Sequence, residues 1–365
     1  MIKLRTLLLV CALLASLVCT SLLTIGGRAD GGPNHQVLNN NYGVSGGNVN
    51  DISRRFCCSG TLGSLVQDTT GALYILSNNH VLARSDQATV GEDISQPGLV
   101  DNNCVAPRIV ADFTTAPALG SNVDAALAAL RPGTMNTTGA IEDIGTISSV
   151  VKLPTVGLAV AKSGRTTGFT TGTIGSINTS VSVRYPKSCG ANGGSAVTYR
   201  NQVVINSSTF SAGGDSGSLI VSNNSASCHQ PVALLFAGSS TTTIGNPISD
   251  VLVALSAKLG LTVSFVGGIC TAATTAFEPK LSAVGGQVEL SPLAVERVTG
   301  VLRAVEREIM ARPGVIGIGV GAAGKLSNEA AIVIYVDRTA PPADLPTSIE
   351  GVKVRTIYTD PIIAY

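Results

Sequence analysis

Short runs of apolar residues recur between residues 51 and 270 and are separated by clusters of Gly, Asn, Ser and Thr. Such runs, several of which alternate apolar and polar positions, are typical of β-strands. They are GTLGSLV, ALYILS, DAALAAL, GLAVAKSG, GTIGSI, QVVIN, SLIVS and VALLFAG. Their spacing predicts an all-β sandwich or barrel and disfavours alternating β-strands and helices.

A helical period appears in two places. Ser249 can cap one helix, whose apolar positions are Val251, Leu252, Leu255 and Leu259. Ser291 and Pro292 begin a second helix, which Pro313 ends. Three strand-like runs follow it, VIGIGVG, AAIVIYV and KVRTIY. We therefore expect residues 280–365 to form a small α+β accessory domain, separate from the β-rich region.

The N-terminal residues resemble a targeting segment. Lys3 and Arg5 precede a long apolar stretch, and Gly27 and Ala29 are small residues at the positions that a signal peptidase reads. Residues 1–29 are thus predicted to be a cleaved signal peptide, and the protein to be secreted or extracytoplasmic, in the periplasm or at the cell surface. An uncleaved membrane anchor is the alternative, because the apolar stretch is nearly long enough to span a bilayer. The Gly- and Asn-rich residues 30–50 predict a flexible lead-in.

Composition excludes some classes of protein. With 44% hydrophobic residues the chain can form a large core, so wholesale disorder is excluded. Its 24 Lys and Arg balance 23 Asp and Glu without basic runs, which argues against nucleic acid as a partner. The charged fraction about doubles after residue 276, and this supports a domain boundary near residues 271–290.

Six cysteines lie outside the signal segment: Cys57, Cys58, Cys104, Cys189, Cys228 and Cys270. An even number in an exported chain indicates up to three disulfide bonds. We expect Cys189 to pair with Cys228, one of Cys57 and Cys58 to pair with Cys104, and the other to pair with Cys270. Histidines are few and no Cys-x-x-Cys pair occurs, so neither a metal site nor a cofactor is expected.

The candidate chemistry is concentrated at residues 213–218, with the sequence GGDSGS. A serine hydroxyl is a poor nucleophile unless an imidazole accepts its proton, and glycines allow backbone N–H groups to point at an oxyanion. His80 ends an apolar run and Asp124 stands just before another, so the order along the chain is His80, Asp124, Ser216. Asp112 is an alternative for the acid.

These segments resemble the motifs of trypsin-like serine proteases, the chymotrypsin-fold family. The sequence KSGRTTG at residues 162–168, followed by GTI, resembles the start of the second barrel in bacterial alpha-lytic-type proteases. The similarity covers about residues 56–265. It implies a mainly β protein, with a double six-stranded Greek-key β-barrel over residues 51–270 followed by the small C-terminal α+β domain.

The resemblance also implies a role for each residue. His80 would be the general base, Asp124 its orienting carboxylate and Ser216 the nucleophile. The N–H groups of Gly214 and Ser216 would form the oxyanion hole. Phe210 would lie at the base of the primary specificity pocket and leave it shallow and apolar, which favours small or medium apolar side chains over Arg or Lys.

Two departures from the family pattern accompany these roles. Ser218 stands where the family usually has Gly, and no Ile-Val-Gly-Gly-like sequence is present to form an ion pair with Asp215 after activation.

The expected function is that of an exported serine endopeptidase, which hydrolyses peptide bonds of protein or peptide substrates through an acyl-enzyme intermediate. The alternative is a binding or scaffold protein of the same fold with an occluded or inactive site. An α/β-hydrolase esterase is disfavoured, because Ser218 breaks the Gly-x-Ser-x-Gly elbow and the histidine precedes the serine.

Overall fold

The structure, a computed structural model, describes residues 35–53, 56–191, 194–223, 228–269, 289–340 and 344–365. The predicted signal peptide, residues 1–29, and Cys270 lie outside these ranges. No helix of the described residues has the length and apolar character needed to cross a membrane.

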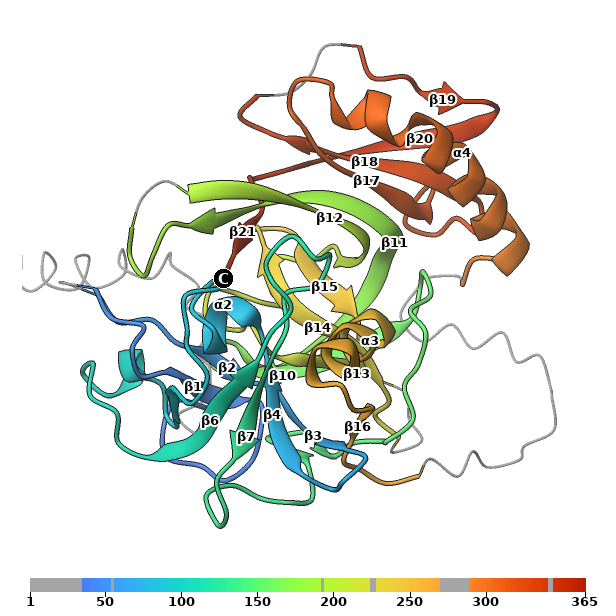
Figure 1. The fold of residues 1–365 in the computed structure, drawn as a ribbon. Coiled ribbons are helices and arrows are strands. Elements are labelled where there is room, and N and C mark those ends of the chain that lie inside the picture. The colour runs from blue at the N-terminus through green and yellow to red at the C-terminus, as the bar shows by residue number, and fades with distance from the viewer. Residues whose placement is uncertain (1–34, 54–55, 192–193, 224–227, 270–288, 341–343) are drawn as a thin grey trace, which may run out of the picture. The chain divides into compact units, whose positions relative to one another are not determined.

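The first barrel contains the N-terminal strands (Figure 1). They are β1 (Val44–Asn48), β2 (Gly60–Leu62), β3 (Ser64–Asp68), β4 (Leu73–Ser77), β5 (Asp93–Ser95), β6 (Ile109–Thr115) and β7 (Ala126–Leu130). Their order in the sheet is β3-β4-β7-β6-β5-β1-β2, with β16 (Val263–Phe265) beside β3. Only Gly63 separates β2 from β3, so the two are halves of one bent strand and the sheet closes on itself. Gly63 is required there, because a Cβ would collide with the carbonyl oxygen of Gly217.

The second barrel repeats this topology. Its strands are β10 (Ala159–Gly164), β11 (Gly168–Pro186), β12 (Gly194–Ile205), β13 (Leu219–Ser222), β14 (Pro231–Gly238) and β15 (Thr243–Pro247). They are ordered β10-β13-β14-β15-β12-β11, and pairing of β10 with β11 closes the ring. Numbered along the chain, the strands of each barrel follow the order 1-2-3-6-5-4, which is a Greek key. Within the described ranges the protein is therefore a chymotrypsin-like double β-barrel, which confirms the predicted fold class.

Short elements connect or cover the barrels. They are α2 (Asn79–Leu82), the 3-10 helix Leu99–Asp101, the hairpin of β8 (Ala140–Ile141) and β9 (Gly145–Thr146), and α3 (Ile248–Leu259). Helix α3 packs on the first barrel's core through Ile248, Val251 and Leu255. It is the helix that the apolar period predicted, but its N-cap is Pro247 and Ser249 lies inside it. Since Pro247 has no side-chain hydroxyl, the helix begins without the predicted side-chain cap.

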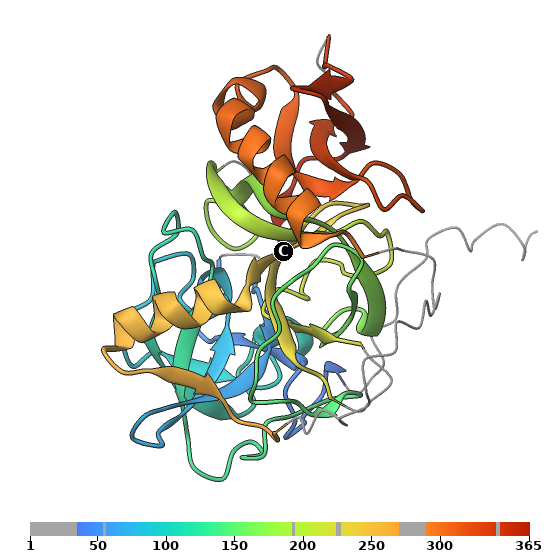
Figure 2. The same cartoon turned by 90° about the vertical axis from the view of Figure 1, so that its right-hand side faces the viewer.

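The C-terminal region continues the second barrel (Figures 1 and 2). It consists of α4 (Pro292–Met310), β17 (Val315–Ala322), β18 (Ala330–Asp337), β19 (Ser348–Ile349), β20 (Val352–Thr359) and β21 (Ile363–Ala364). The predicted helix and three strands are present, and Ser291 and Pro292 begin α4 as expected. The expected independence is not seen, because β17 pairs antiparallel with β11. The sheet thus runs from the second barrel into this region.

The predicted lead-in differs as well. Residues 44–48 form β1, which is wholly buried between β2 and β5, and the His35 ring is buried near Gly43 and Asp143. The first barrel therefore begins before residue 51. The sequence VSGGN has no strand pattern of its own. It forms a strand because it pairs with β2 and β5.

One hydrophobic cluster joins α4 to the second barrel. Leu302 and Val298 of α4 belong to the same buried cluster as Ile174 and Ile205 of the barrel. Leu302 is 2% exposed, whereas Leu293 of the same helix is 78% exposed.

We expect Leu302→Ala to lower the free energy of unfolding by about 2–5 kcal/mol, because it leaves a cavity in this shared cluster. Urea denaturation should show a single shifted transition for the barrel and the C-terminal region. Leu293→Ala is the matched control and should change stability by less than about 0.5 kcal/mol. A separate early transition of the C-terminal region alone would contradict the shared cluster.

Candidate active site

His80 and Asp124 meet because they follow and precede neighbouring strands. His80 lies in α2, directly after β4, and Asp124 lies two residues before β7, which pairs with β4. The His80 Nδ1 is 2.6 Å from Asp124 Oδ2, and the His80 backbone N–H donates to Oδ1 at 3.2 Å. The Asp124 side chain is fully buried. This carboxylate therefore fixes both the position and the orientation of the imidazole.

The second barrel holds Asp124 from its other side. The Tyr185 hydroxyl of β11 donates to Asp124 Oδ2 at 2.8 Å and lies 2.7 Å from the Tyr199 hydroxyl of β12. The Asp124 N–H donates to Asn246 Oδ1 at 2.9 Å. Burial raises the pKa of the Tyr185 hydroxyl well above its ordinary value, so it stays protonated as a donor. No spacing in the sequence connects these residues with Asp124, so their role could not be predicted.

The alternative acid, Asp112, is paired elsewhere. Its carboxylate accepts from the Arg131 guanidinium at 2.6 Å on the surface of β6 and β7. The structure places Asp124, and not Asp112, against His80.

Ser216 stands in the turn before β13 and is fully buried. Its hydroxyl donates to the Phe236 carbonyl at 3.1 Å. The first barrel holds the turn in place, since Thr61 N–H donates to the Ser216 carbonyl at 2.8 Å and the Thr61 hydroxyl donates to the Gly214 carbonyl at 2.9 Å. The atom that His80 Nε2 faces, at 2.9 Å, is the backbone oxygen of Tyr365.

The candidate oxyanion hole consists of the backbone N–H groups of Gly214 and Ser216. Gly214 has a φ of 98°, in the region that favours glycine. A Cβ at this position would lie 2.5 Å from the Thr166 Oγ1. Among the described residues, no hydrogen bond occupies the N–H groups of Gly214 or Ser216. Both donors are thus free to bind an oxyanion.

A buried ion pair supports the same turn. Lys162 Nζ lies 3.3 Å from Asp215 Oδ2, and both side chains are fully buried. Asp215 also accepts from the N–H groups of Thr166 and Thr167 at 2.8 and 3.1 Å, and from that of Ala212 at 3.0 Å. Lys162 therefore supplies the cation that compensates the buried Asp215 carboxylate.

Phe210 was expected at the base of the specificity pocket, but it lies in the core of the second barrel. Its ring is fully buried in the second barrel's core with Ile174 and Ile205 and packs on Gly172. Its neighbour Ser211 is the residue whose side chain reaches the hydroxyl of Tyr365. The position in the sequence does not show whether the side chain of Phe210 or that of Ser211 points into the core.

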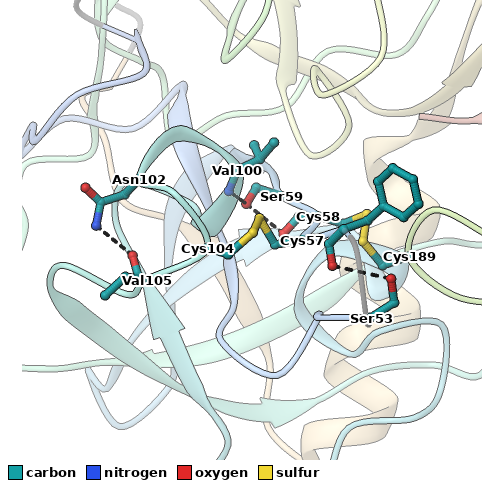
Figure 3. The surroundings of a disulfide bond; sticks show 10 residues. Ser53, Cys57, Cys58, Ser59, Val100, Asn102, Cys104, Val105 and Cys189 are labelled. Atoms are coloured by element: carbon teal, nitrogen blue, oxygen red, sulfur yellow. Dashed lines mark hydrogen bonds between the residues drawn. A yellow bond between two sulfur atoms is a disulfide. The ribbon is translucent and has the colours of Figure 1, made fainter.

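The disulfides bear out one of the three expected pairs (Figure 3). Cys57 pairs with Cys104, as expected. Cys58 pairs with Cys189, across 131 positions, so the predicted Cys189–Cys228 pair is wrong, as is pairing of either Cys57 or Cys58 with Cys270. Cys228 is also disulfide-bonded. No group of side chains suited to holding a metal ion occurs in the described part of the chain.

No family model matches the chain, and no curated protein matches it. Among solved structures, the chain is similar to those of bacterial serine proteases of the chymotrypsin fold. A glutamic acid-specific serine protease is 20% identical, with a TM-score of 0.42, over 61% of this chain and 98% of that one. The chymotrypsin of Cellulomonas bogoriensis is 20% identical, with a TM-score of 0.41, over 63% and 100%. The Nocardiopsis protease NAPase is 16% identical, with a TM-score of 0.41, over 62% and 98%.

The protonation of His80 is set by opposing effects. Burial lowers the pKa of the imidazole, but the charge of Asp124, its hydrogen bond and the Tyr365 carbonyl together raise that pKa above its ordinary value of 6.5. The imidazole can accept a proton only when it is neutral, so His80 can act as a base only as the pH rises through this raised pKa.

We expect NMR titration to give His80 a pKa above 6.5, and Asp124→Asn to lower it, because the substitution removes the charge and hydrogen bond that favour the imidazolium. His229 in the same spectra is an internal reference. A His80 pKa that does not change in Asp124→Asn would contradict the pairing.

Lys162→Met should lower the free energy of unfolding by about 3–5 kcal/mol, because it leaves the Asp215 carboxylate buried without a cation. The double variant Lys162→Met/Asp215→Asn should recover much of this loss in urea denaturation. Lys187→Met, at an exposed position, is the control. A double variant no more stable than the single one would show that the pair does not determine stability.

Proposed function

We propose that the protein is a serine endopeptidase that hydrolyses peptide bonds of protein or peptide substrates. The observation that carries the proposal is the contact between His80 and the buried Asp124, beside a turn that offers Ser216 and two unoccupied N–H donors. A buried carboxylate on one imidazole nitrogen leaves the other nitrogen to act on a serine.

Each of these residues has its own role in the reaction. Ser216 Oγ attacks the substrate carbonyl carbon while His80 Nε2 accepts its proton, and the N–H groups of Gly214 and Ser216 bind the oxyanion. When the C–N bond breaks, His80 returns the proton to the leaving amine and an ester joins the acyl group to Ser216. Water, deprotonated by His80, then hydrolyses this ester and releases Ser216. Asp124 stabilises the imidazolium throughout.

Export is part of the proposal. The charged and apolar N-terminal segment supports a secretory signal. The disulfides Cys57–Cys104 and Cys58–Cys189 support an oxidising compartment.

A second candidate is a scaffold protein whose site is occluded. The hydrogen bond between His80 and Tyr365 favours this candidate, because it occupies the nitrogen that must accept the Ser216 proton. Direct labelling of the nucleophile separates the two functions.

We expect a fluorophosphonate probe to label Ser216, and Ser216→Ala to abolish labelling and reduce peptide hydrolysis by roughly four orders of magnitude or more. Mass spectrometry of the labelled peptide identifies the site. Ser208→Ala, at an exposed serine of the preceding loop, is the control and should keep both properties. Full turnover by Ser216→Ala would refute the assignment.

A further inference from the structure

The last residues of the chain lie in the cleft as an added strand. Strand β21 pairs antiparallel with the end of β14, with Ala364 opposite Ala237 and Ile363 opposite Gly238. On its other side it pairs with β11 at Arg184. Figure 1 shows this end of the chain beside α2, the helix that carries His80. An extended segment added to a sheet in this way is a general mode of peptide recognition.

The backbone of Tyr365 reaches the catalytic groups. Its N–H donates to the Phe236 carbonyl at 3.3 Å, and this same carbonyl accepts from the Ser216 hydroxyl. Its backbone oxygen accepts from His80 Nε2 at 2.9 Å. The Tyr365 N–H is thus bound to the carbonyl that also accepts from Ser216, and the Tyr365 backbone oxygen is bound to the general base, His80.

These contacts also decide the state of His80. The Asp124 carboxylate and the Tyr365 oxygen are both acceptors, so both ring nitrogens must donate, and only the imidazolium can do so. An imidazolium cannot take the proton of Ser216. His80 can therefore activate Ser216 only when the segment has left the cleft.

The Tyr365 side chain enters a pocket beside β14. Its hydroxyl donates to the Ser239 carbonyl at 3.0 Å. Burial raises the pKa of this hydroxyl to about 12, with Ser211 close by. Gly238 leaves the room that the ring needs, because a Cβ there would lie 2.5 Å from Tyr365 Cζ and would overlap its hydroxyl oxygen. The pocket fits an aromatic ring with a donor at its far end.

The other side of the catalytic centre is open. A cavity of about 280 Å³ borders Tyr365 and is lined by His80, Gly214, Ser59 and the Cys58–Cys189 disulfide. The segment therefore fills the part of the cleft on one side of the nucleophile and leaves room on the side where a leaving group would lie.

We propose that residues 362–365 occupy the cleft as the acyl side of a peptide substrate would, with Tyr365 at the position whose carbonyl is attacked. This inference rests on the proposed peptidase function and names its substrate class. The site cleaves after aromatic residues, with a preference for tyrosine. The C-terminal segment of the same chain inhibits it. The sequence had predicted a pocket for small or medium apolar residues, on the assumption that Phe210 closes its base.

The first test is release of inhibition in the full chain. Tyr365→Ala removes the ring and its hydrogen bond, and should raise the rates of Ser216 labelling and peptide hydrolysis at least tenfold. Tyr358→Ala, at a tyrosine of β20 that is 54% exposed, is the matched control and should not change either rate. Unchanged rates in Tyr365→Ala would overturn inhibition by the segment.

The second test is specificity in the activated Tyr365→Ala variant. A peptide library should show cleavage mainly after Tyr and Phe, and the synthetic peptide DPIIAY, which matches residues 360–365, should inhibit competitively. Adding Gly238→Val should abolish cleavage after aromatic residues while Ser216 is still labelled, because the new side chain fills the pocket. Cleavage mainly after small or basic residues would overturn the assigned substrate class.

The outcomes separate the two proposals. If Ser216 is labelled and peptides are hydrolysed equally in the natural sequence and in Tyr365→Ala, without aromatic preference, only this inference fails. If Ser216 is labelled in neither protein, the proposed peptidase function fails as well.

Discussion

The active-site turn depends on one buried carboxylate, that of Asp215. A carboxylate without solvent is costly unless a cation and hydrogen bonds compensate it. Here Lys162 supplies the cation, and the N–H groups of Thr166, Thr167 and Ala212 supply hydrogen bonds. All of these groups except Ala212 come from the hairpin of β10 and β11. By satisfying Asp215, this hairpin sets the turn in which Gly214 and Ser216 lie.

Two of the proposed catalytic residues, Asp124 and Ser216, are held by the barrel that does not carry them. Asp124 stands on the first barrel but is held by Tyr185 and Asn246 of the second. Ser216 stands on the second barrel, and Thr61 of the first holds its carbonyl. The geometry therefore exists only when the two barrels are packed together, which explains why the glycines at their contact are so tightly constrained.

The sequence predicted the elements whose signal is local. The strands β13 and β14 and the helix α4 are continuous apolar or periodic segments, and the motif around Ser216 is a short run of residues. Features that depend on distant partners were missed. Cys58 and Cys189 are 131 positions apart, yet folding brings their Cα atoms to 5.6 Å. Likewise, Tyr365 has no motif around it, and only the folded chain places it against His80.

The C-terminal sheet explains how the final residues find the cleft. Because β17 continues the sheet from β11, β20 ends beside the second barrel, where the Thr359 hydroxyl lies 2.5 Å from that of Ser239. Ser239 also accepts from Tyr365, so the same loop anchors the start and the end of the segment. Such tethering gives the segment a high effective concentration at the cleft. Since only β21 and its few hydrogen bonds need to detach, the cleft can open while the shared core of α4 and the second barrel stays folded.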